Sequence, residues 1–207
     1  MPETHAFSDL RPRLKTGDIV LMGGTSIFSR AIRKLTGSDW SHVAMVVRVE
    51  EYDTVLLWES TTNGHDKDVQ TGEIKRGVQL VPLSKRVSEH TGNLAFRLLS
   101  RELTRTEIGR LNAFRHSVKD KGYDFDGLEL LRAALDSGLF WSNREDLTAY
   151  FCSELIAETY QAIGFLDKTK PSNEYTPDDF SVGAAPPLEL QGGVHLGDEI
   201  VVSRESD

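Results

Sequence analysis

The chain has 207 residues, a formal net charge of −8 and one cysteine, and 39% of its residues are hydrophobic. This length predicts a single domain over 1–207, and the acidic charge argues against a general nucleic-acid binder, which needs a basic surface. A lone cysteine excludes an internal disulfide. Because the sequence shows neither a signal-peptide pattern nor an apolar run long enough to span a bilayer, we expect a cytoplasmic protein without integral membrane association.

Short apolar runs separated by turn residues dominate the first half of the chain. Residues 1–15 resemble an irregular arm, and 61–77 resemble an exposed loop. A helix is predicted over 25–35, where Thr25 can cap it and Gly37 can end it. Strands are predicted over 18–22, 42–49, 54–58, 78–81 and 94–98.

Helical spacing replaces this pattern in the second half. Thr104 and Glu107 form a capping-box pattern before a helix that reaches Val118. A second helix is predicted from Asp126 to Leu135, and a third from Cys152 to Gly164. Residues 166–198 are expected to be loop-rich before a last strand over 199–202. This segregation of strands and helices predicts an α+β fold, with an antiparallel sheet or barrel packed against helices.

Cys152 is a candidate nucleophile because the pattern places it where the third helix begins. A thiol at a helix N-terminus experiences the positive end of the helix dipole, which favours the thiolate. Free backbone N–H groups at such a terminus can also stabilise an oxyanion. The alternative interpretation is that Cys152 is a small buried apolar side chain.

A base and an orienting carboxylate are predicted from the hairpin over 42–58. Antiparallel pairing brings the end of the second strand, with Glu59, towards the start of the first, with His42. An imidazole beside a thiol can accept its proton, and a carboxylate on the other ring nitrogen fixes the tautomer. A core histidine and a structural ion pair are the alternatives, and Asp39 and Asp53 compete with Glu59 as the orienting carboxylate.

The order and context of five short segments resemble the permuted papain-like branch of the NlpC superfamily, in particular the YiiX-like cysteine hydrolases. The resemblance covers about residues 15–165. It rests on Gly17-Asp18-Ile-Val-Leu, Ser41-His42-Val, Glu59, Gly122-Tyr123-Asp124-Phe125 and Phe151-Cys152-Ser153-Glu154-Leu155.

The resemblance implies a circularly permuted papain-like fold with the nucleophile at a helix N-terminus. It implies that Cys152 is the nucleophile, His42 the base and Glu59 the third polar residue. It also implies that Tyr123 lines the site or helps hold the oxyanion, although a core tyrosine with a satisfied hydroxyl fits the residue pattern as well.

These residues together predict a thiol hydrolase of the amidase, peptidase or isopeptidase type that works through an acyl-enzyme. Its partner would be a peptide, an amide-containing molecule or another acyl substrate. No cofactor or metal is expected, since the histidines lack metal-ligand spacing. A lipid acyltransferase or thioesterase using the same cysteine and a non-catalytic module binding a peptide or lipid are the alternatives. The sequence does not indicate an oligomeric state.

Overall fold

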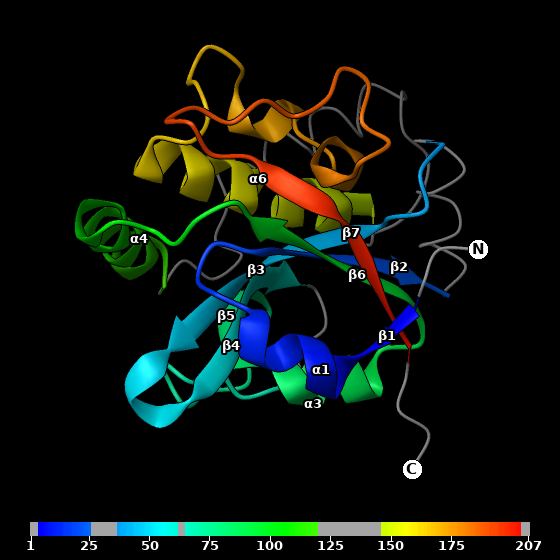
Figure 1. The fold of residues 1–207 in the computed structure, drawn as a ribbon. Coiled ribbons are helices and arrows are strands. Elements are labelled where there is room, and N and C mark those ends of the chain that lie inside the picture. Colours follow the sequence, from blue (N-terminus) through cyan, green and yellow to red (C-terminus); the bar gives the residue numbers. More distant parts are fainter. Residues whose placement is uncertain (1–3, 26–36, 62–64, 120–145, 204–207) are drawn as a thin grey trace, which may run out of the picture.

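The computed structural model describes residues 4–25, 37–61, 65–119 and 146–203 (Figure 1). The predicted helix over 126–135, nearly all of the predicted helix over 25–35, and Tyr123 lie outside the described residues.

The centre of the molecule is a seven-stranded sheet with the order β1-β7-β6-β2-β3-β4-β5. Its strands are β1 (Thr4–Ala6), β2 (Ile19–Gly24), β3 (His42–Val49), β4 (Thr54–Thr61), β5 (Gly77–Pro82), β6 (Gly92–Leu99) and β7 (Leu196–Ser203). All neighbouring strands are antiparallel except β1 and β7, which are parallel. The strands predicted from the apolar runs are confirmed, and β1 is an addition within the arm.

Four α-helices and four short 3₁₀ turns accompany this sheet in the described ranges, giving a mixed α+β architecture. They are α1 (Phe7–Leu10), α3 (Leu83–Glu89), α4 (Arg105–Val118), α6 (Asp146–Ile163), η1 (Arg11–Arg13), η2 (Glu50–Tyr52), η3 (Ser172–Glu174) and η4 (Pro177–Phe180). The prediction of an irregular arm over 1–15 is therefore wrong for most of its length, because β1, α1 and η1 pack there.

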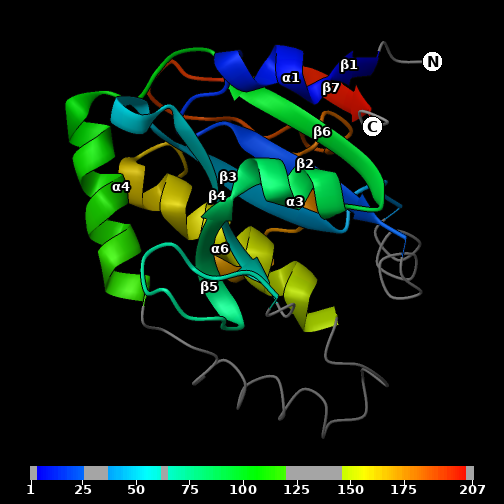
Figure 2. The same ribbon diagram turned by 90° about the horizontal axis from the view of Figure 1, so that it is seen from below.

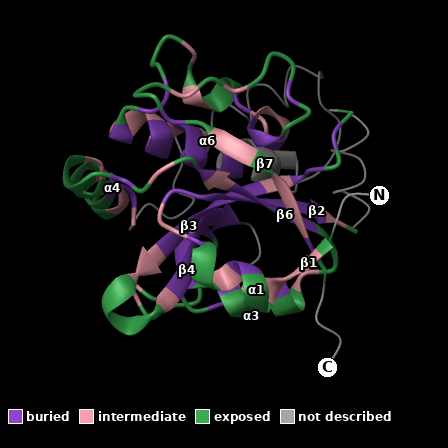
Figure 3. Cartoon of the chain, in the orientation of Figure 1, coloured by how far each residue is buried: buried purple, intermediate pink, exposed green. Residues whose placement is uncertain are grey.

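The helices form a layer on each face of the sheet: α4 and α6 lie on one side, α1 and α3 on the other (Figures 1 and 2). Alternate residues of β3 supply the two cores, since Val43 and Met45 belong to the cluster with α6, whereas Ala44 and Val46 belong to the cluster with α1 and α3. Covering both faces explains why the central strands are apolar without a break and why they are buried in Figure 3.

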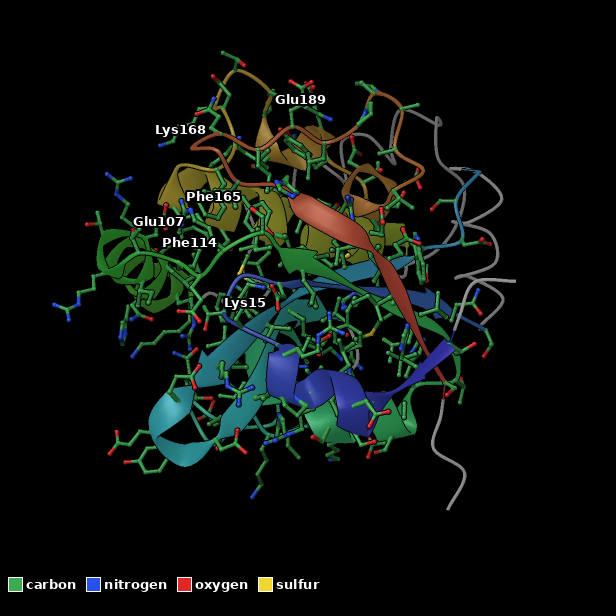
Figure 4. The ribbon with its side chains drawn as sticks, viewed as in Figure 1. Lys15, Glu107, Phe114, Phe165, Lys168 and Glu189 are labelled. Atoms are coloured by element: carbon green, nitrogen blue, oxygen red, sulfur yellow. The ribbon has the colours of Figure 1, made fainter. Side chains whose placement is uncertain are left out.

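The capping box predicted before α4 is confirmed. The backbone N–H of Glu107 donates to the Thr104 hydroxyl, and the Glu107 carboxylate accepts from the Thr104 N–H at 2.7 Å. Arg101 donates to both carboxylate oxygens of Glu107 at 2.8 Å and lies over the ring of Phe165, with Cζ 5.5 Å from the centroid. Figure 4 shows Glu107 and Phe165 on the same side of the molecule, where these contacts connect α4 to the end of α6.

Arg97 of β6 holds the loop-rich segment that follows α6 against the sheet. Its guanidinium donates to the backbone oxygens of Phe180, Ser181, Leu196 and Gly197 at 2.8 to 3.2 Å. The side chain is almost completely buried. One cation therefore serves four carbonyl groups, two in the segment after α6 and two at the start of β7.

No helix in the described ranges is both long and apolar enough to cross a membrane.

Replacing Arg97 with Met keeps much of the side-chain volume and removes all four donors. We expect the free energy of unfolding to fall by about 3 kcal/mol, because buried carbonyls lose charged hydrogen-bond partners. Urea unfolding followed by circular dichroism measures this change. Arg105→Met, at an exposed position of α4, is the matched control and should cost about 0.5 kcal/mol or less. Equal costs for the two variants would contradict the anchoring role of Arg97.

Candidate active site

His42 and Glu59 meet as the hairpin register predicts. Nε2 of the imidazole lies 2.9 Å from Oε2 of Glu59. His42 is the first residue of β3, and Glu59 lies near the end of β4. The paired residues of these strands run from Val49–Thr54 to Met45–Trp58, so the two side chains meet just beyond the last pair. Asp53, a competing carboxylate, instead pairs with Arg11 and Arg48.

The second oxygen of Glu59 accepts from two other elements. Gln79 of β5, directly opposite Glu59 in the sheet, donates from Nε2 to Oε1 at 2.8 Å. Arg86 of α3 donates from a terminal guanidinium nitrogen to the same oxygen at 2.7 Å. The carboxylate is completely buried. Its three partners lie on β3, β5 and α3.

These partners keep Glu59 ionised despite its burial. Burial by itself would raise the pKa of the carboxyl, but the hydrogen bond from His42, the charges of Arg86 and His42, and the hydrogen bond from Gln79 outweigh it and lower the pKa to about 2. Glu59 is therefore an acceptor at neutral pH, which is the state that can orient an imidazole.

Cys152 of α6 contacts the same imidazole. Its side chain is hydrogen-bonded to His42 and has no exposed surface. Because Glu59 occupies Nε2, the ring nitrogen left for the sulfur is Nδ1. The three predicted residues thus form one continuous set of contacts, Cys152–His42–Glu59.

The surroundings of His42 favour its protonated form. Burial would lower the pKa of the imidazole, but the charge and hydrogen bond of Cys152, followed by the hydrogen bond and charge of Glu59, raise it from 6.5 to about 10. The imidazole therefore carries its proton between two potential anions at neutral pH.

The predicted position of Cys152 within its helix is wrong. Helix α6 begins at Asp146, so Cys152 lies about two turns inside it. The dipole effect and the free N–H groups are confined to the first turn, and neither acts on this thiol. Glu154, two residues after Cys152, also lies inside the helix, and burial and the nearby charge of Glu158 raise its pKa.

The contacts of these residues join the two helical layers through the sheet. Glu59 accepts a hydrogen bond from Arg86 of α3, and His42 contacts Cys152 of α6. Helices α3 and α6 lie on opposite faces of the sheet (Figures 1 and 2). Strict alternation from Ala44 and Val46 places His42 on the α3 side. His42 can reach Cys152 on the opposite face because it lies beyond Met45–Trp58, the last pair of β3 and β4, where the two strands separate.

Sequence reasoning missed Arg86 and Gln79. The register of β4 with β5 could have indicated Gln79, because it lies opposite Glu59. Arg86 required the prediction of α3, which was not made. Tyr123, predicted to line the site, lies outside the described residues. Within the described ranges, no group of three or more His, Cys, Asp and Glu side chains is arranged to hold a metal ion.

No protein-family model and no curated protein matches this chain. Solved structures do match its fold, among them a crystal structure of the metalloprotein yiiX from Escherichia coli O157:H7. That match has 20% sequence identity and a TM-score of 0.48, and it covers 92% of this chain and 97% of that chain. The NlpC assignment and the permuted papain-like core stay predictions.

Replacing Glu59 with Gln removes the negative charge shared by His42 and Arg86. We expect the free energy of unfolding at pH 7 to fall by about 3 kcal/mol, because two partly buried cations lose their counter-ion. The folded-state pKa of about 2 lies below the usual 4.5. The wild-type advantage is therefore complete above pH 4.5 and disappears as the pH falls towards 2.

Denaturant unfolding at several pH values measures this difference. Glu50→Gln is the matched control, because Glu50 also pairs with an arginine, Arg48, but is 79% exposed. It should change stability by less than about 1 kcal/mol. A Glu59→Gln variant as stable as Glu50→Gln would rule out a buried, ionised Glu59.

Replacing Cys152 with Ala should lower the pKa of His42 from about 10, because the imidazolium loses one of its two anionic partners. Titration of the ring resonances by NMR measures this. The stability that His42 contributes is present below pH 6.5 and is lost as the pH rises towards 10, and in the variant this loss should begin at lower pH. Ile156→Val, a change in the same helix, should leave the midpoint in place. An unchanged midpoint in Cys152→Ala would contradict the contact.

Proposed function

We propose that this protein is a cysteine-dependent hydrolase that cleaves amide, peptide or isopeptide bonds through an acyl-enzyme. The observation that carries the proposal is the unbroken set of contacts from Cys152 through His42 to Glu59. A nucleophile, a base and a group that orients the base are the parts that covalent acyl transfer requires. The permuted papain-like core belongs to the same proposal and is supported by the order of His42 and Glu59 before Cys152.

In the proposed reaction, His42 carries a proton between the thiol, the leaving amine and water. The Cys152 thiol gives its proton to His42, and the thiolate attacks the substrate carbonyl, forming a C–S bond. The imidazolium then donates that proton to the departing amine as the C–N bond breaks. Water attacks the thioester while His42 takes one of its protons, the C–S bond breaks, and the proton returns to the sulfur.

His42 activates the thiol in this proposal, because Cys152 lies too far inside α6 for the dipole to do so. Once His42 has taken the proton of Cys152, the pKa of about 10 keeps that proton on the imidazole at neutral pH. The imidazolium is then ready to protonate the leaving group. Glu59 holds Nε2 and leaves Nδ1 for the proton transfer.

A substrate reaches the sulfur from the side of His42. Cys152 has no exposed surface, whereas the side chain of His42 is 14% exposed. A carbonyl group must therefore displace part of what covers the thiol before attack is possible. A small activated ester is consequently the best first probe, since it demands the least displacement.

The test uses p-nitrophenyl acetate. We expect a burst of about one equivalent of p-nitrophenolate, with one acetyl group on Cys152 in the mass spectrum, followed by slower turnover. Cys152→Ala should abolish the burst, and His42→Ala should slow acetylation by about 10² to 10⁴-fold. His116→Ala, at an exposed position of α4, is the control and should leave the burst unchanged.

The alternatives give different results in the same experiment. An acyltransferase would pass the acetyl group to an added amine or lysolipid faster than to water. A binding module would show no burst, and Cys152→Ala would bind an added peptide or lipid as well as the wild type. Acetylation at neutral pH that does not depend on His42 would refute the hydrolase mechanism.

A further inference from the structure

The buried carboxylate of Glu59 divides its contacts between the proposed chemistry and the opposite face of the sheet. Oε2 faces His42 at 2.9 Å, while Oε1 accepts from Arg86 at 2.7 Å and from Gln79 at 2.8 Å. With one oxygen held by two donors on separate elements, the plane of the carboxylate has little freedom to rotate. The position of Oε2, and with it the orientation of the imidazole, depends on those donors.

We infer that Arg86, supported by Gln79, is a positioning residue for the Cys152–His42–Glu59 site, acting on it from the helical layer opposite Cys152. This inference rests on the proposed function, because it assigns these residues a role in the same reaction. Neither residue touches His42 or Cys152 in the contacts described above, so both act through Glu59.

The geometry of Arg86 suits it to this role. One terminal nitrogen contacts Glu59, and the other lies 3.6 Å from the buried carboxylate of Asp66. A planar guanidinium presents several donors in a fixed arrangement, and its second terminal nitrogen is attracted by the charge of Asp66 at a distance longer than a hydrogen bond. The neighbouring Lys85 also pairs with Asp66. Because Lys85 neutralises Asp66, the positive charge of Arg86 remains available to Glu59.

The charged groups around Glu59 decide whether its pKa rises or falls when Arg86 is removed. His42 faces it from β3, Arg86 from α3, and Gln79 offers a neutral donor from β5. Asp66 lies beyond Arg86, and Cys152 beyond His42. Removing Arg86 takes away one of two cations, so the carboxyl of Glu59 should protonate at higher pH and lose its fixed orientation.

The experiment compares Arg86→Met with the wild type by two measurements. In the first, ¹³C NMR of glutamate labelled at the side-chain carboxyl follows the titration of Glu59, which is assigned by its loss in Glu59→Gln. We expect the midpoint to rise by about 1 to 3 pH units. In the second, the rate of Cys152 acetylation by p-nitrophenyl acetate at pH 7 should fall by about 10- to 100-fold, because the imidazole is no longer held in place.

Arg105→Met is the matched control, because it makes the same substitution at an exposed position of α4, in the other helical layer. It should leave both the Glu59 midpoint and the acetylation rate unchanged. Arg86→Lys keeps the charge but cannot span two carboxylates in the same way, so its Glu59 midpoint should stay near the wild-type value while its acetylation rate falls between wild type and Arg86→Met.

Gln79→Met keeps the inference testable if Arg86→Met fails to fold. It removes the second donor to Oε1 without removing a charge, and it should raise the Glu59 midpoint by less than Arg86→Met while still slowing acetylation. Variants that only lose stability, with the midpoint and the rate of the folded protein unchanged, would overturn the inference.

The two measurements separate this inference from the proposed function. If the wild type is not acetylated at Cys152 but the Glu59 midpoint rises in Arg86→Met, the hydrolase proposal fails while the control of Glu59 by Arg86 stands. If the wild type is acetylated and neither reading changes in Arg86→Met, the hydrolase proposal stands and Arg86 has no positioning role.

Discussion

The ionised carboxylate of Glu59, buried near the end of β4, is the constraint on which the rest of the structure depends. A buried charge without partners is far more costly than a buried apolar group of the same size. Glu59 avoids this cost only because β3, β5 and α3 each place a donor against it. The strand order β3-β4-β5 and the packing of α3 below the sheet are therefore required by the same side chain that orients His42.

The opposite layer has to place Cys152 against His42, and buried polar contacts fix α6 along its length. The hydroxyl of Tyr160 donates to the backbone oxygen of Gly17 before β2 at 2.8 Å, and Ser153 donates to that of Tyr175 at 2.5 Å. Asp18, beside Gly17, is itself fixed by the backbone N–H groups of Lys15 and Leu99. The first of these contacts holds the helix that carries the sulfur against the residues before β2, the strand that pairs with β3.

The sequence was sufficient to predict the strands and the contact between two residues of one hairpin. Strand positions followed from apolar runs, and the meeting of His42 with Glu59 followed from hairpin pairing, which the register fixes to one residue. Helix α3 was missed because it is a single short segment, Leu83–Glu89, whose helical state depends on burying Leu83 and Val87. With α3 unpredicted, Arg86 could not be connected to Glu59.

The start of α6 illustrates a second limit. The apolar spacing after Cys152 was taken as the beginning of the helix, whereas the helix already includes Asp146. Helix boundaries depend on which backbone groups tertiary packing satisfies, and periodicity does not reveal this. The chemical role assigned to the helix dipole was therefore wrong, although the residue itself meets His42 as expected.

This correction changes how the thiol can be activated. Among the described contacts of this fully buried sulfur, the imidazolium of His42 is the group that can stabilise its anion. That imidazolium in turn depends on Glu59, and Glu59 on donors from the far side of the sheet. In the proposed mechanism, reactivity at Cys152 therefore depends on contacts in both cores, and a change in α3 would alter it without touching the substrate.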